Sequence, residues 1–130
     1  MLGSDNRSTA LLAIRLMLCV IMFIHGAARI ANGTVDDFGG FLTSQGFPLG
    51  FFLAWGVTIF ELVGSVLLAA GFYAWIIALA FAAELALGMA LVHWKEGWFV
   101  VGHGRNGIEF SVVLIVSLLA TAYANYKRGG

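Results

Sequence analysis

Seven ionisable side chains lie inside stretches of this sequence that are otherwise apolar. The five stronger candidates for a chemical role are Arg15, His25, Arg29, Glu61 and Glu84, and the two weaker ones are His93 and Glu109. A charge at the centre of a bilayer costs at least about 2.5–3.5 kcal/mol on insertion scales, so it needs a partner and commonly marks a functional site. These residue types offer proton exchange by carboxylates and imidazoles, with guanidinium groups balancing the charge.

One face of the first apolar stretch carries most of these groups. Polar or small residues, together with Met22, recur there at steps of three and four: Arg15, Cys19, Met22, His25, Gly26 and Arg29. In a helix this spacing places side chains on one face, which we predict to look inward. We predict an intramembrane network in which Arg15 pairs with Glu61 or Glu84, while His25 and Arg29 close it from the other side. The alternative is purely structural, since interhelical polar contacts contribute roughly 0.6–2 kcal/mol each.

The two weaker candidates have strong structural explanations. Glu109 follows Asn106 by three positions, which predicts a capped helix with the acidic residue at its third position. His93 is nine residues after Glu84, or roughly 180° around a helix at 100° per residue, so we expect it to face the headgroups instead of the network. No His-x-x-x-His or Glu-x-x-His spacing predicts a metal site.

The elements that must position these residues are apolar helices. Of 130 residues, 61% are hydrophobic and 11% charged, whereas a soluble domain has about 25% charged residues, and the mean hydropathy is +0.94. Four segments have about the 20 residues needed to cross a bilayer: 10–31, 51–71, 72–94 and 107–126. We predict an all-α integral membrane protein, a four-helix transmembrane bundle formed by one domain, residues 1–130.

Two polar connections and one turn link these spans. The chain must fold back near Gly71, since the second and third spans are contiguous. The segment 32–50, with five glycines and the only proline, is predicted to be an interfacial loop or short helix over the bundle. The connection 95–106 contains the string GHGRNG at 102–107, which lacks the βαβ context of a dinucleotide site.

Charge and cysteine content exclude several function classes. Seven basic and seven acidic residues leave no excess to bind nucleic acid. The single cysteine, Cys19, excludes an internal disulfide. An even number of spans places both termini on one side of the membrane, and the positive-inside rule favours the cytoplasm.

The ordered set of these residues resembles the DoxX family over residues 15–126. It comprises Arg15 within RLMLCVIMFIHGAAR, the His25–Gly26 pair with a base at Arg29, the run Phe-Glu-Leu-Val-Gly at 60–64, and Glu109 after a glycine. The resemblance implies a small four-span protein of the bacterial or archaeal inner membrane. Relatives serve as the membrane subunit of thiosulfate:quinone oxidoreductase or partner soluble thiol-redox enzymes. The sequence departs from the family pattern at two positions: Ser65 stands where a second glycine is common, and Arg29 stands where lysine is common. Because arginine replaces lysine, position 29 cannot supply a nucleophilic amine.

We therefore expect a membrane subunit of a redox system, whose polar interior binds a quinone or a similar small carrier and relays protons. The sequence carries no haem, flavin or metal motif, so electrons must come from another subunit or a soluble redox enzyme. A noncatalytic anchor or accessory subunit of a larger complex is the alternative, and a small transporter or proton pathway is the third. Association into a homo-oligomer is compatible with each, and the sequence assigns no catalytic residue.

Overall fold

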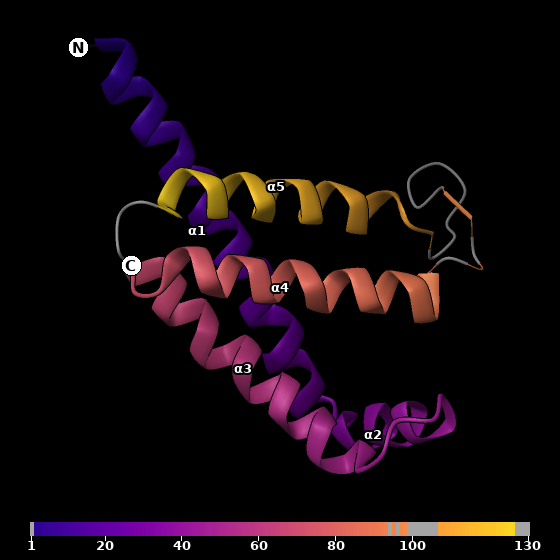
Figure 1. Cartoon of the computed structure of the whole chain (residues 1–130). Helices are drawn as coiled ribbons and strands as arrows, with labels where there is room; N and C mark the ends of the chain where they lie inside the picture. Colours follow the sequence, from indigo (N-terminus) through magenta and orange to yellow (C-terminus); the bar gives the residue numbers. More distant parts are fainter. Residues whose placement is uncertain (1, 94, 96, 99–106, 127–130) are drawn as a thin grey trace.

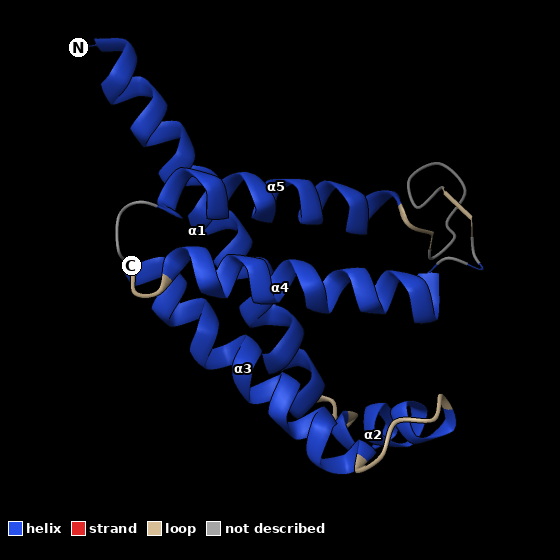
Figure 2. Ribbon diagram, in the orientation of Figure 1, coloured by secondary structure: helices blue, strands red, loops and turns tan. Residues whose placement is uncertain are grey.

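Helices form all the regular structure that the computed structural model describes, which comprises residues 2–93, 95, 97, 98 and 107–126 (Figures 1 and 2). In chain order they are α1 (Leu2–Ala31), α2 (Val35–Ser44), α3 (Gly50–Ala70), α4 (Ala74–Gly88), the π-helical segment η1 (Met89–His93) and α5 (Glu109–Asn125). The predicted all-α fold is confirmed.

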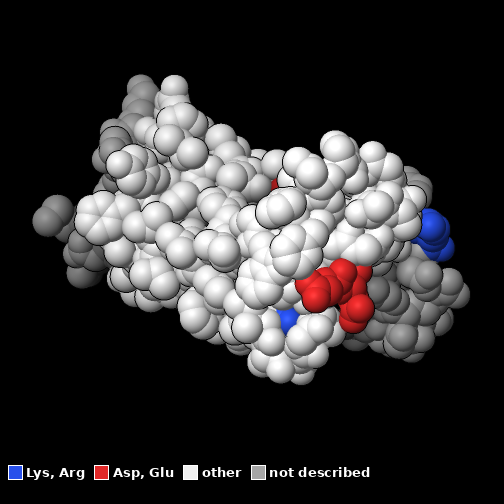
Figure 3. Space-filling view, turned by 90° about the horizontal axis from the view of Figure 1, so that it is seen from below, with Lys and Arg blue, Asp and Glu red and all other residues white. Residues whose placement is uncertain are grey.

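Three of these helical stretches are long and apolar enough to cross a membrane: Asn6–Ala31, Gly50–Ala70 and Ala74–His93. The fourth, α5, has 17 residues, the lower end of the range of about 17–25 residues for a spanning helix. Large apolar side chains cover their outward faces, and Val20, Ile59 and Val116 are each more than half exposed. The face seen in Figure 3 is mostly uncharged, apart from one acidic patch and small basic areas. Lipid is the solvent that suits such a surface.

The spans pack as two antiparallel pairs. Helix α1 lies along α3, and α4 lies along α5, while α3 and α4 contact each other less extensively (Figure 1). Leu18, Leu68, Phe81 and Leu118 are completely buried where the two pairs meet. The ring of Phe81 also packs against Phe60, with 4.9 Å between centroids. One apolar core therefore joins all four spans.

The predicted reversal near Gly71 is present. Gly71 ends α3 in the left-handed conformation, with φ 89°, which glycine adopts without steric cost. Tyr73, with φ 54°, then precedes α4. Helix α4 therefore begins at Ala74, two residues later than predicted.

The segment between the first two spans contains the predicted short helix. Helix α2 buries Val35, Gly39 and Leu42 and packs against α3. A Cβ atom at Gly39 would lie 3.0 Å from the Cα atom of Phe51, so a larger residue there would push the two backbones apart. The second connection, 95–106, lies mostly outside the described residues, and so do Trp94 and residues 102–106 of the GHGRNG string.

Close contact at Gly26 sets the register between α1 and α3. A Cβ atom there would lie 3.0 Å from the carbonyl oxygen of Thr58 and 3.2 Å from the Cβ atom of Glu61. Because the two helices are antiparallel, residues later in α1 face residues earlier in α3. This register brings Arg29 to Thr58 and Glu61, and Arg15 to Ala69.

Replacement of Gly26 by alanine is expected to destabilise the protein by about 1–3 kcal/mol, the usual cost of overpacking. The backbone oxygen of Thr58 cannot move aside as a flexible side chain would. Gly56→Ala on α3 is the matched control, because a Cβ atom there meets no atom within 4 Å. Thermal unfolding in detergent measures both variants, and equal midpoints would contradict the close approach.

Candidate functional site

A buried ion pair joins the end of α1 to the middle of α3. The Nη1 atom of Arg29 lies 2.7 Å from Oε1 of Glu61 and donates a second hydrogen bond of 2.9 Å to Oγ1 of Thr58. The Glu61 side chain is 1% exposed and that of Arg29 is 18% exposed. The guanidinium also lies over the ring of Phe38 from α2, 4.6 Å from its centroid, a cation–π contact.

The buried face of α3 supplies the polar groups around this pair. Thr58, Glu61 and Ser65 are all buried there, spaced at three and four residues. The hydroxyl of Thr58 donates to the Ala54 carbonyl at 2.7 Å, and that of Ser65 donates to the Glu61 carbonyl. Each hydroxyl is thus satisfied within α3, and Thr58 still accepts from Arg29.

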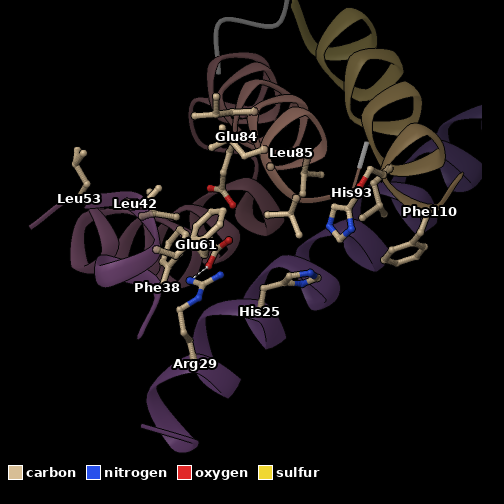
Figure 4. Close-up of a pocket in the computed structure, with 18 of the residues that line it drawn as sticks. His25, Arg29, Phe38, Leu42, Leu53, Glu61, Glu84, Leu85, His93 and Phe110 are labelled. Carbon is tan, nitrogen blue, oxygen red and sulfur yellow. Dashed lines mark hydrogen bonds and ion pairs between the residues drawn. The ribbon is translucent and has the colours of Figure 1, made fainter. Parts of the chain in front are cut away.

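Glu84 of α4 brings a second carboxyl group to the same place. The carboxyl groups of Glu61 and Glu84 point toward each other in Figure 4, and they interact electrostatically. The Oε1 atom of Glu84 is buried and has no hydrogen-bond partner among the described residues. The Arg29 guanidinium therefore lies near two carboxyl groups, but it forms an ion pair only with Glu61.

These groups border a cavity of about 450 Å³ that is otherwise mostly apolar (Figure 4). Its walls come from α1, α2, α3, α4, η1 and α5, with aromatic side chains at Phe38, Phe41, Phe47 and Phe110. The volume lies within the range of about 300–1,000 Å³ for small-molecule sites. A few polar groups in apolar walls are also typical of such sites.

Two imidazoles line the cavity beside the carboxyl groups. Nδ1 of His25 lies 2.7 Å from the carbonyl oxygen of Ile21. A carbonyl only accepts, so Nδ1 must donate, and in neutral His25 the Nε2 atom is then the free acceptor. His93 also lines the cavity and has interactions of its own.

The expectation that His93 faces away from the site was wrong. It assumed a regular α-helix, but Met89–His93 forms a π-helix. A π turn holds more residues than an α turn, so each residue rotates by less than 100° and His93 does not reach the opposite face. Such segments occur frequently at functional sites.

The predicted pairing of Arg15 with Glu61 or Glu84 was also wrong. The Arg15 guanidinium instead donates to the Ala69 carbonyl at 3.3 Å and to Oδ1 of Asn125 at 3.5 Å. Eight residues separate Glu61 from Ala69, about 12 Å along the helix axis. The antiparallel register therefore gives the pairing with Glu61 to Arg29 alone.

Glu109 lies apart from the cavity lining. Helix α5 begins at Glu109 after Ile108 as its N-cap, with no capping hydrogen bond from that side chain. Glu109 is therefore the first helical residue and not the third, and Asn106 lies outside the described residues. Its position still suits the positive end of the helix dipole, and its side chain has interactions of its own.

The structure adds site residues that the sequence did not single out. Phe38, Phe41 and Phe47 stand out as aromatic residues in a glycine-rich segment, but only the packing of α2 shows that they wall the cavity. Within the described ranges, no three of the His, Cys, Asp and Glu side chains gather closely enough to bind a metal ion.

Apolar spans that enclose an apolar core and a buried ion pair define a helical integral membrane protein with a pocket between its helices. The family model named DoxX matches residues 10–94, which run from α1 to the end of the π-helical segment. This is more than half of the sequence, so the chain belongs to the DoxX family. No curated protein and no solved structure was found to match it.

Arg29→Gln is expected to cost about 3–5 kcal/mol, because it leaves Glu61 buried without its cation. Glu61→Gln is expected to cost less, since the Arg29 side chain keeps more exposure. The double variant should recover most of the larger loss. Chemical unfolding in detergent micelles measures this cycle, and strictly additive effects would show that the pair contributes no coupling.

Proposed function

We propose that this protein is the membrane subunit of a redox system, and that its pocket binds the head group of a quinone or a similarly small, partly apolar electron carrier. The observation that carries the proposal is the composition of the cavity. Aromatic and aliphatic walls enclose about 450 Å³, enough for a substituted ring. Carboxyl and imidazole groups reach the same space from different helices (Figure 4).

In this proposal, side chains of the pocket supply protons to the bound ligand. Reduction of a quinone to a quinol takes up two electrons and two protons, one proton at each carbonyl oxygen. In the proposal Glu61 stays paired with Arg29, while Glu84 carries an exchangeable proton, because a second unpaired carboxylate in an apolar site is costly. The unpartnered Oε1 of Glu84 supports this assignment.

The histidines are proposed to serve the second oxygen of the ligand. The hydrogen bond from Nδ1 of His25 to Ile21 leaves Nε2 without a proton in the neutral ring. In the proposal Nε2 first takes up a proton from water, and the imidazolium so formed passes it to the second carbonyl oxygen of the ligand. His93 lines the same cavity, and the two labelled imidazoles both lie beside the pocket in Figure 4.

Electrons are proposed to come from a partner, either another subunit or a soluble thiol-redox enzyme, as the family resemblance implies.

We place the protein in the cell inner membrane with both termini in the cytoplasm. The contact between Arg15 and Asn125 supports termini on one side. A cytoplasm-specific reporter fused after Gly130 should be active, and activity only of a reporter specific for the opposite side would contradict this orientation.

Filling the pocket provides the sharpest test of ligand binding. Gly88 lines the cavity, and a Cβ atom there meets no atom within 4 Å. Gly88→Leu should therefore fold normally but occupy the ligand space and abolish binding. Gly56→Leu is the matched control, since Gly56 also has open space but is not among the lining residues.

The measurement is titration of the purified protein with a short-chain quinone, together with extraction of co-purified quinone. Glu84→Gln and His25→Ala should retain binding and lose proton-coupled quinone reduction with the native redox partner. Unchanged quinone binding in Gly88→Leu would overturn the proposal. Loss of complex assembly without loss of quinone binding or redox activity would favour the noncatalytic anchor.

A further inference from the structure

Arg15 lies at the end of the bundle opposite to the Arg29–Glu61 pair. It makes no ion pair with any residue that the structure describes, and its Nε atom is buried without an acceptor. Its two hydrogen bonds, to the Ala69 carbonyl and to Asn125, are long, at 3.3 and 3.5 Å. The carbonyl ends of α3 carry only a partial negative charge. The Arg15 guanidinium therefore has no full counter-charge among the described residues.

A small cavity of about 100 Å³ opens beside this guanidinium. It is lined by Ser8, Leu11, Leu12, Arg15, Ala124 and Asn125. The polar lining consists of a hydroxyl, a guanidinium and an amide, which are all able to donate hydrogen bonds to an anion. The two leucines are 41% and 44% exposed, so the same cavity borders an apolar surface.

Aromatic residues place this cavity at the level of the lipid headgroups. All three tyrosines of the chain lie at this end: Tyr73 before α4, and Tyr123 and Tyr126 at the end of α5. They are 62%, 87% and 55% exposed. Exposed tyrosines at the end of a membrane span mark the boundary between hydrocarbon and headgroups.

We propose that this cavity binds the phosphate of an anionic membrane phospholipid, with its acyl chains along Leu11 and Leu12. Arginine matches phosphate through several N–H donors at once. A net negative lipid fits better than a zwitterionic one, because the unmatched charge of Arg15 needs a full counter-charge. The apolar rim favours a lipid over a soluble anion.

The test compares thermal unfolding of the purified protein with added phosphatidylglycerol or with phosphatidylcholine of the same acyl chains. Wild type and the exposed-site control Arg7→Gln should unfold at higher temperature with phosphatidylglycerol. Arg15→Gln should lose this lipid-dependent shift. An unchanged shift in Arg15→Gln would overturn the proposal, and so would an equal shift produced by inorganic phosphate without lipid.

Native mass spectrometry keeps the proposal testable if Arg15→Gln does not fold. Ser8→Ala removes a hydroxyl from the cavity lining without touching the bonds of Arg15 to Ala69 and Asn125. This variant should retain less phosphatidylglycerol than wild type, and Arg7→Gln should retain as much. Equal retention by all three proteins would contradict the site. Quinone binding is independent of these readouts, because the two cavities share no residue.

Discussion

A carboxylate inside a bilayer has no water to solvate it, so the place of its counter-charge constrains the structure around it. Glu61 is buried in the middle of α3, and its cation, Arg29, comes from the far end of α1. The contact depends on the antiparallel register of the two helices, which their close approach at Gly26 sets. The ring of Phe38 then covers the guanidinium, so the position of α2 depends on the same pair.

The same constraint divides the two arginines of α1 between different tasks. They are 14 residues apart in the sequence, about 21 Å along a helix, so they cannot serve one site. Arg29 balances Glu61 and leaves Glu84 without a cation of its own beside a mostly apolar cavity, with its Oε1 atom unpartnered among the described residues. The hydrogen bonds of Arg15 link α1 to the ends of α3 and α5. Its positive charge therefore lies at the end of the bundle that carries the tyrosines. The two arginines therefore belong to two separate groups of polar residues, each beside its own cavity.

Irregular backbone gathers around the larger cavity. The π-helical segment places His93 in the wall of this cavity, and the short helix α2 adds aromatic side chains to it. Local patterns in a sequence describe regular helices well, and departures from them commonly occur where a site is built. Two of the proposed proton-exchange groups, His25 and Glu84, lie on regular α-helices, which hold them in place, and the more irregular elements close the space around them.

Composition and the lengths of the apolar segments were sufficient to determine an all-α membrane protein, its reversal near Gly71 and the ionisable residues of interest, because spanning a bilayer requires long apolar helices. The partner of each charge was decided only by tertiary structure. The positions of the ionisable residues in the predicted spans indicate that Arg15 pairs with Glu61 or Glu84, whereas the register set by Gly26 gives the pairing with Glu61 to Arg29. Rotation at 100° per residue likewise misplaces His93, since Met89–His93 is π-helical and each residue there rotates by less than 100°.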